Sequence, residues 1–260
     1  MNAEMSEYGK FLENKFKMNE DCGFKVAESD INPKLYDFQR AIVRWAVKKG
    51  RASIFADCGL GKSVMQLEWA RVIGGKCLIL APLAVSKQTV GEGRKIGITV
   101  NICESQEDVK GGINITNYEK LHKFDASAFD SVILDESSIL KSFDGEYRKQ
   151  ITESFKDTKF KLACTATPSP NDHMELGNHS EFMGVMSRTE MLSTYFVHDG
   201  GDTAVWRLKK HAVSEFWKWV CSWAIYLRNP SELGYDGKRF ELPELKIHKH
   251  ILRLDKPTDG

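Results

Sequence analysis

Short apolar runs recur along the middle of the chain and predict the strands of a buried sheet. They lie at residues 52–56, 76–81, 99–103, 113–117, 131–136 and 160–166. Runs that are apolar throughout are typical of parallel strands covered on both faces. Most of the stretches between them carry helical patterning, such as residues 62–73, which end at Gly74 and Gly75. The pattern therefore predicts an α/β fold with a parallel central sheet and helices on both faces.

Segments on either side of this region predict further elements. Residues 32–50 place apolar side chains at helical spacing and stop at Gly50, which indicates an amphipathic helix. A turn signal at residues 199–202 favours a hairpin. Beyond it, one helical stripe is expected to pack in the core in preference to stacking on bases. The stripe contains Val213, Phe216, Trp217, Val220, Trp223, Ala224 and Leu227.

Composition narrows the classes of function. The chain has 37 Lys and Arg against 36 Asp and Glu, a formal net charge of +1, so nucleic acid must be met by a local basic patch. The six cysteines show no C-x-x-C pair and no zinc spacing, which favours a reducing, cytoplasmic setting. The sequence shows neither a secretion signal nor an apolar run of ~18 residues, and we expect no membrane association.

The strongest chemical signal is ADCGLGKS, residues 56–63, which lies between a predicted strand and a predicted helix. Gly59 and Gly61 allow backbone N–H groups to approach a phosphate chain, and the start of a helix adds donors and a partial positive charge. Lys62 would reach the β and γ phosphates, and Ser63 would ligate Mg²⁺. Ala56 stands where the full P-loop pattern has glycine, so a plain glycine turn before a helix is the alternative interpretation.

Two further signals follow strands of the same predicted sheet. Asp135 and Glu136 end the run at 131–136, where an aspartate can hold Mg²⁺ and a glutamate can activate water. The carboxyl ends of parallel strands open onto one crevice, so these carboxylates are expected to face the phosphate loop. Thr165 and Thr167 follow the next strand, where their hydroxyls could sense the γ-phosphate. The alternative is a strand that simply ends at a proline turn.

Together these motifs resemble superfamily 2 helicases and translocases, and among them the Swi/Snf-type DNA-dependent ATPases, with compact phage and bacterial proteins most similar. LYDFQRAIVRW is similar to the family's Q-type motif, DCGLGKS to its phosphate loop, DESSILK to its carboxylate motif and CTATPSPN to its motif III. YLRNPSELGYDGKRFELPEL resembles the segment that leads into a second lobe. The likeness runs from about residue 32 to the end.

The resemblance implies a RecA-like P-loop lobe that binds ATP and Mg²⁺. The nucleotide-binding residues it implies are Phe38, Gln39, Cys58, Gly59, Leu60, Gly61, Lys62 and Ser63, with Gln39 on the adenine edge. Ser63 and Asp135 would hold the metal, and Lys62, Asp135 and Glu136 would be catalytic. Nucleic-acid backbone contacts are expected at Pro82, Lys87, Thr116, Asn117 and Tyr118. Thr165 and Thr167 would couple the nucleotide site to the rest of the lobe.

Two departures from the family pattern shape the expected function. Ser138 stands where many relatives have histidine, so coupling would fall to Ser137, Thr165 and Thr167. No second lobe follows residue 230, although in the family that lobe supplies arginines to the ATP site. An arginine finger contributes about 10³ to 10⁵ in turnover in related systems. We therefore expect one lobe of a longer motor, with weak nucleotide binding and little hydrolysis by itself.

The expected organisation is an N-terminal arm at 1–30, the ATP-binding lobe at 31–230 and a linker toward a second lobe at 231–260. The expected function is that of an ATP-dependent DNA translocase or helicase, monomeric, with RNA left open as a partner. One alternative is a non-motor ATP-sensing interaction module. Another is an ordinary P-loop kinase or small-molecule NTPase, which the Q-type and TAT-type motifs disfavour.

Overall fold

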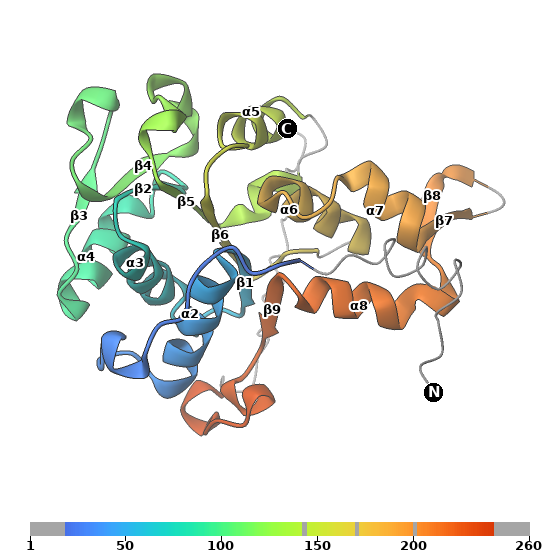
Figure 1. The fold of residues 1–260 in the computed structure, drawn as a ribbon, viewed down its shortest axis with the longest axis horizontal. Helices are drawn as coiled ribbons and strands as arrows, with labels where there is room; N and C mark the ends of the chain where they lie inside the picture. The colour runs from blue at the N-terminus through green and yellow to red at the C-terminus, as the bar shows by residue number, and fades with distance from the viewer. Residues whose placement is uncertain (1–18, 142–144, 170–171, 200–201, 242–260) are drawn as a thin grey trace, which may run out of the picture.

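The computed structural model describes residues 19–141, 145–169, 172–199 and 202–241, and its centre is a seven-stranded sheet (Figure 1). The strand order is β3-β4-β2-β5-β6-β1-β9, and every neighbouring pair is parallel. The strands are β1 (Arg51–Ala56), β2 (Lys76–Ala81), β3 (Val100–Ile102), β4 (Gly112–Asn117), β5 (Ser131–Asp135), β6 (Phe160–Thr165) and β9 (Ala224–Leu227). All six apolar runs are strands, which confirms the α/β prediction.

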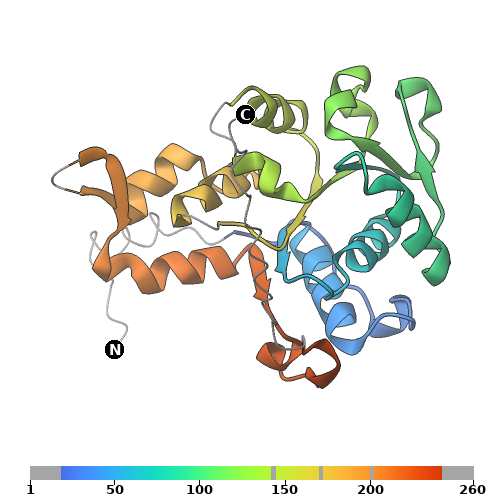
Figure 2. The ribbon, with the colours of Figure 1, turned by 180° about the vertical axis from the view of Figure 1, so that it is seen from behind.

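Helices cover both faces of the sheet (Figures 1 and 2). The first face carries α2 (Asp37–Lys49), α3 (Lys62–Ile73) and α4 (Ser86–Ile96), and the second carries α5 (Glu146–Ser154) and α6 (Leu176–Met183). Successive strand residues alternate between the two cores: Ile54 and Ala56 of β1 belong to the first, and Phe55 to the second. As expected, α2 stops at Gly50, whose φ is 72°.

Short 3₁₀ helices form many of the connections. They are η1 (Glu28–Asp30), η2 (Gln106–Asp108), η3 (Tyr118–Lys123), η4 (Ala126–Ala128), η5 (Ser137–Lys141), η6 (His173–Glu175), η7 (Lys210–Ala212), η8 (Pro230–Leu233) and η9 (Lys238–Phe240). Of these, η3 follows β4 directly and η5 follows β5 after Glu136, so both stand at the carboxyl edge of the sheet.

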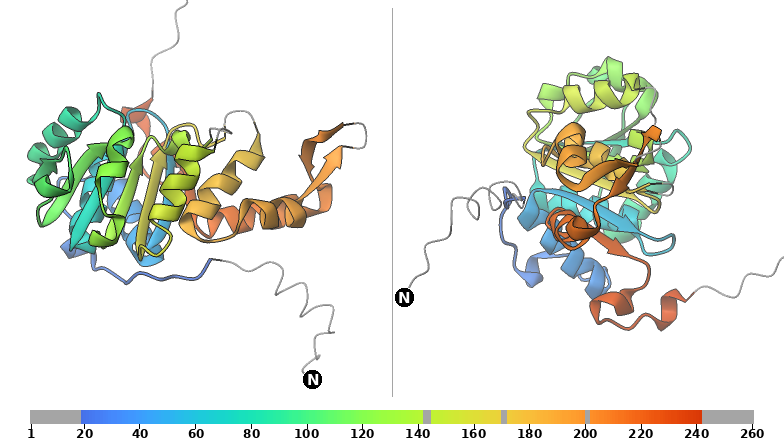
Figure 3. Two further views of the ribbon diagram at one scale, coloured as in Figure 1. Left: turned by 90° about the horizontal axis from the view of Figure 1, so that it is seen from above. Right: turned by 90° about the vertical axis from the view of Figure 1, so that its right-hand side faces the viewer.

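An arm projects beyond the sheet, as the left view of Figure 3 shows. It contains α7 (Arg188–Tyr195), the antiparallel hairpin of β7 (Phe196–Asp199) and β8 (Asp202–Leu208), and α8 (Val213–Cys221). The hairpin confirms the turn expected at 199–202, of which residues 200–201 lie outside the described residues. Phe216 and Val220 of the expected stripe are buried in the arm's core beside Tyr195, whereas Val213 is 40% exposed and Trp217 is partly buried.

The prediction of one helix running through residues 213–227 is wrong at its end. The helix α8 stops at Cys221, and residues 224–227 form β9, a parallel strand beside β1. Ser53 N donates to Trp223 O at 2.8 Å, and Asp57 N donates to Leu227 O at 2.9 Å. The free edge of β1 offers backbone groups that need partners, and this long-range pairing outweighs local helical periodicity.

The ends of the described chain lie against the lobe. Cys22 N and Gly23 N donate to the carbonyls of Lys49 and Lys48 at the end of α2. Phe240 of η9 packs edge-on against Phe38, with ring centroids 5.2 Å apart. Residues 1–18 of the expected arm and 242–260 of the expected linker lie outside the described residues, and the domain boundaries stay a prediction. Across the part of the chain that the structure describes, no helix is long and apolar enough to cross a bilayer.

Candidate nucleotide site

The loop between β1 and α3 has the backbone shape that a phosphate cradle requires. Gly59 and Gly61 have φ of 85° and 78°, values in the left-handed region that side chains disfavour. The helix α3 begins at Lys62 and runs for 12 residues, so its N-terminal N–H groups and positive dipole end open at this loop. Lys62 Nζ donates to Ala56 O at 2.9 Å and to Asp57 O at 3.4 Å. Its ammonium therefore lies at the start of the loop.

Gln39 fixes the position of this loop relative to α2. It is 4% exposed, its Nε2 donates to Leu60 O at 3.0 Å, and its Oε1 accepts from Tyr36 N at 3.0 Å. A Cβ added at Gly61 would lie 2.4 Å from Gln39 Nε2. Both ends of the amide thus bond to the protein, so a contact with adenine would require Gln39 to exchange one of these bonds.

The rings of Tyr36 and Phe38 lie at the start of α2, next to Gln39. Phe38 is 2% exposed, while Tyr36 is 40% exposed and lies in a stacked orientation 6.2 Å from Phe38 between centroids. The Arg239 guanidinium lies 5.3 Å from the Tyr36 ring centroid. Phe38 therefore packs inside the fold, and Tyr36 presents its ring to solvent.

The carboxylate of Asp135 lies deep at the end of β5. The residue is 4% exposed, and burial raises the pKa of its carboxyl group above the ordinary value. Gln66 Nε2 donates to Asp135 Oδ1 at 2.7 Å, and the Lys62 charge acts in the opposite direction to burial on the same pKa. Sequence reasoning missed Gln66, although it lies four residues after Lys62 and so on the same face of α3.

Glu136 stands on a sharp turn after β5. Its φ of 51° makes it the one residue other than glycine with positive φ among those the structure describes. Thr165 Oγ1 donates to Glu136 Oε2 at 3.2 Å, and Thr167 N donates to Thr165 Oγ1 at 3.1 Å. The structure thus bonds Thr165 of the predicted coupling segment to the second carboxylate, and Thr167 to Thr165.

The predicted nucleic-acid contacts divide into exposed and buried positions. Lys87 is exposed at the start of α4, and Pro82 is half-buried. Thr116, Asn117 and Tyr118 are 2%, 6% and 4% exposed. Tyr118 Oη donates to Asp135 O at 2.7 Å, so this side chain supports the carboxylate strand. The nucleic-acid contacts stay predictions, and for these three buried side chains the structure gives interior positions.

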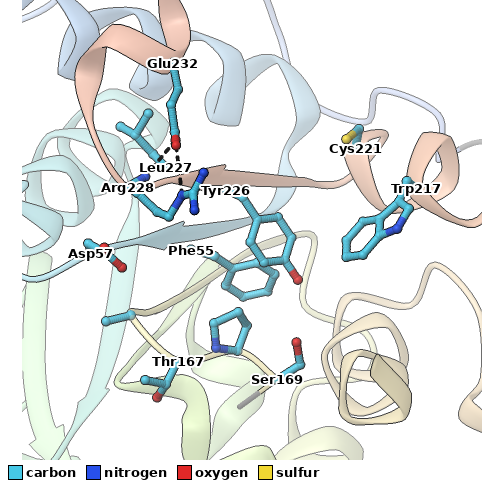
Figure 4. Close-up of a pocket in the computed structure, with 12 residues that line it drawn as sticks. Phe55, Asp57, Thr167, Ser169, Trp217, Cys221, Tyr226, Leu227, Arg228 and Glu232 are labelled. Atoms are coloured by element: carbon cyan, nitrogen blue, oxygen red, sulfur yellow. Dashed lines mark hydrogen bonds and ion pairs between the residues drawn. The ribbon is translucent and has the colours of Figure 1, made fainter. Parts of the chain in front are cut away.

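A pocket of about 920 Å³ opens beside Phe55 of β1 and Tyr226 of β9 (Figure 4). Phe55, Tyr226 and Trp217 line it with aromatic rings, and Thr167 and Asp57 connect it to the rim of the phosphate loop. Burial raises the pKa of the Tyr226 hydroxyl, and its hydrogen bond to Ser169 partly opposes this. The pocket depends on β9, which the sequence pattern did not predict, so it was missed as well.

The residues present fit a magnesium nucleotide. The loop offers an open backbone cradle at Gly59, where an added Cβ would meet nothing within 4 Å. Ser63 is half-buried on the first turn of α3, and Asp135 adds a buried carboxylate beside the Lys62 charge. Hydroxyl and carboxylate oxygens are the ligands that Mg²⁺ prefers. The described residues contain no cluster of three His, Cys, Asp or Glu side chains, so the protein would hold the ion together with phosphate oxygens.

Comparisons with known proteins identify similar folds. No protein-family model matches the chain. The chain superposes on the Sulfolobus solfataricus SWI2/SNF2 ATPase core in complex with dsDNA with a TM-score of 0.55 and 19% identity, covering 66% of this chain and 41% of that one. The chain has the fold of part of a SWI2/SNF2 ATPase core. The likeness expected from the motifs is thus confirmed at the level of the fold.

Two further proteins are similar to this chain. It is 28% identical over 169 residues to the Xenopus tropicalis SWI/SNF-related matrix-associated actin-dependent regulator of chromatin subfamily A-like protein 1, covering 57% of this chain and 17% of that protein. The UvsW helicase from bacteriophage T4 has a TM-score of 0.49 and 16% identity, covering 71% of this chain and 67% of that one. The chain spans less than half the length of the Sulfolobus solfataricus core and of the Xenopus tropicalis protein.

Replacing Gly61 by alanine is expected to weaken Mg-ATP binding by at least about tenfold. The added Cβ would meet Gln39 at a left-handed φ of 78°, which alone costs an L residue roughly 1–2 kcal/mol. Isothermal titration calorimetry measures the affinity. Gly97→Ala is the matched control, since Gly97 has φ of 79° and ψ of 23°, close to the 78° and 40° of Gly61, but no atom within 4 Å of its added Cβ. Equal affinities in the two variants would contradict the role given to Gly61.

Proposed function

We propose that this lobe is the first RecA-like lobe of an ATP-dependent DNA translocase or helicase. One observation carries the proposal: the phosphate loop, the two carboxylates and the threonine segment meet at one edge of the sheet. The Lys62 charge acts on Asp135, Gln66 bonds Asp135, and Thr165 bonds Glu136. A glycine turn without function would not require a buried carboxylate and a strained glutamate beside it.

Each residue has a defined task in this proposal. The loop at Gly59–Gly61 and the start of α3 bind the phosphates through backbone N–H groups, and Lys62 adds its charge. Ser63 and Asp135 would hold Mg²⁺, which when bound would neutralise phosphate charge and orient the phosphates. Glu136 accepts a proton from the attacking water.

Thr165 links the position of Glu136 to the segment that follows Thr165. In the structure, Glu136 Oε2 already accepts the hydrogen bond from Thr165 Oγ1, and Thr167 N bonds to the same hydroxyl. A change at the γ-phosphate that moved Glu136 would therefore act directly on residues 165–167. This contact supports Thr165 and Thr167 as the coupling residues.

Turnover in this proposal needs a second lobe. Arg228 stands at the same rim, but its Nε is paired with Glu232 at 2.9 Å, so its charge is already partly compensated. The similar SWI2/SNF2 core was solved with dsDNA, and duplex DNA is the partner we propose here. Its backbone would lie along the exposed Leu83 and Lys87 at the start of α4. All six cysteines are free thiols, and we place the protein in the cytoplasm.

The test compares nucleotide binding, DNA binding and ATP hydrolysis by the 260-residue chain with and without a second lobe. We expect Mg-ATP binding, duplex binding that weakens steeply with salt, and hydrolysis that rises when DNA and the second lobe are both present. The same assays with single-stranded DNA, branched DNA and RNA identify which nucleic acid the protein uses. DNA-stimulated hydrolysis by the chain alone would contradict the need for a second lobe. Nucleotide binding without salt-dependent DNA binding would favour the ATP-sensing module.

A further inference from the structure

A buried histidine joins helix α6 to the segment that follows the two carboxylates. His179 and Ser137 are both 0% exposed, and His179 Nε2 lies 3.0 Å from Ser137 Oγ. We propose that His179 is a positioning residue that fixes the turn at Glu136 relative to the phosphate loop. The inference rests on the proposed function for its catalytic meaning, but the contact itself is a feature of the fold.

The turn at Glu136 needs external support. Its φ of 51° is unfavourable for a glutamate, and such a conformation persists only where neighbouring groups hold it. On the strand side, Tyr118 Oη holds the carbonyl of Asp135 at 2.7 Å. On the other side stands Ser137, the next residue after Glu136, and its side-chain bond is the one to His179. Supports before and after Glu136 thus fix the turn between them.

The same imidazole also contacts the strand that leads into the phosphate loop. The ring of His179 lies edge-on to Phe55, with centroids 5.2 Å apart and an interplanar angle of 84°. Phe55 immediately precedes Ala56, whose carbonyl accepts from Lys62. One side chain therefore bridges β1, which leads into the phosphate loop, and η5, which follows the two carboxylates.

The neighbouring residue on α6 strengthens the connection. Asn178 Nδ2 donates to Leu140 O at 2.9 Å, so α6 holds η5 at two separate points. The helix follows the threonine segment in the chain, and Thr165 bonds Glu136 from the side of β6. Glu136 is thus connected to the threonine segment twice, directly through Thr165 and indirectly through α6, His179 and Ser137. This connection gives Ser137 the coupling role expected from the sequence, with a partner that the sequence did not identify.

The bond between His179 and Ser137 predicts different effects for two substitutions of His179. Leucine at 179 fills similar space but leaves the buried Ser137 hydroxyl without its bond, which is unfavourable. Glutamine extends a polar terminal atom to about the reach of Nε2 and can restore the bond. His179→Leu and His179→Gln therefore separate the hydrogen bond from the packing. His211→Leu is the matched control, because His211 is exposed on η7.

The experiment measures backbone hydrogen exchange by mass spectrometry and Mg-ATP affinity by calorimetry, on the full chain and these three variants. In His179→Leu we expect residues 136–140 to exchange at least about tenfold faster, as a local opening would. Exchange in α3 and the affinity for Mg-ATP should stay near wild type, and Mg-ATP should no longer protect residues 165–169. His179→Gln should restore the wild-type pattern, and His211→Leu should not change it.

Two results would overturn the proposal. One is wild-type exchange at 136–140 in His179→Leu. The other is faster exchange spread evenly over α3 and β6, or a failure of His179→Gln to rescue, either of which assigns His179 to packing alone. If the wild-type chain bound no Mg-ATP, the proposed function would fail, while exchange measured without nucleotide would still decide whether His179 holds the turn.

Discussion

Replacing Lys62 by alanine is expected to lower ATP turnover by at least about 10²-fold, the loss seen when one preorganised donor to developing charge is removed. In the structure its ammonium lies over the phosphate loop and bonds the carbonyls of Ala56 and Asp57. Alanine removes the charge that would meet the phosphates, and binding should weaken as well. The measurement is steady-state ATP hydrolysis with DNA and the second lobe present.

Lys76→Ala is the matched control for Lys62. Lys76 is exposed at the start of β2, at the end of the sheet opposite the phosphate loop, so its removal should leave turnover unchanged. Unaltered turnover in Lys62→Ala would refute the assigned site. Equal losses in both variants would indicate a general effect of lysine removal and would also count against it.

Replacing Asp135 by asparagine is expected to lower ATP turnover by about 10²-fold or more. The same substitution is expected to stabilise the fold. Burial raises the pKa of Asp135, so the ionised carboxylate is unfavourable in the native state at neutral pH. Asparagine keeps Oδ1, the atom that accepts from Gln66 at 2.7 Å and from Glu136 N at 3.1 Å. The melting temperature should rise by about 2 °C or more at pH 7, which corresponds to roughly 1 kcal/mol for a chain of this size.

The pH dependence of this stabilisation has a definite sign. A raised native pKa means that the native state binds more protons than the unfolded state, so Asp135 costs stability as pH rises. The advantage of asparagine should therefore be full at pH 7, shrink as pH falls through the raised pKa, and vanish below the ordinary value of 3.8. Asp157→Asn, at an exposed carboxylate, is the control and should not raise the melting temperature at pH 7. A destabilised Asp135→Asn variant would contradict the burial argument.

Local patterns identified the residues at the carboxyl edge of the sheet. The glycines of the phosphate loop, Asp135 and Glu136 each follow an apolar run, and each run is a parallel strand. Parallel strands bring such positions to one edge regardless of their separation in the chain. The contact between Thr165 and Glu136 follows from this rule, because β5 and β6 are neighbours.

Other parts of the site depended on packing that no local pattern records. Gln39, whose contact with adenine stays a prediction, bonds protein partners through both ends of its amide. Tyr118, whose contact with nucleic acid stays a prediction, donates its hydroxyl to Asp135 O. A polar side chain near a ligand site can bond either the ligand or the scaffold, and only the three-dimensional arrangement decides which.

The sequence by itself determined the sheet, its helices and the edge at which chemistry is placed, because apolar runs and glycine positions act over a few residues. Only the tertiary structure decided that residues 224–227 leave the helical stripe to pair with β1, since that choice depends on an open strand edge far away in the chain. It likewise brought His179 to Ser137, 42 residues earlier. Long-range hydrogen bonds of this kind depend on how the helices pack on the sheet, which the local sequence does not encode.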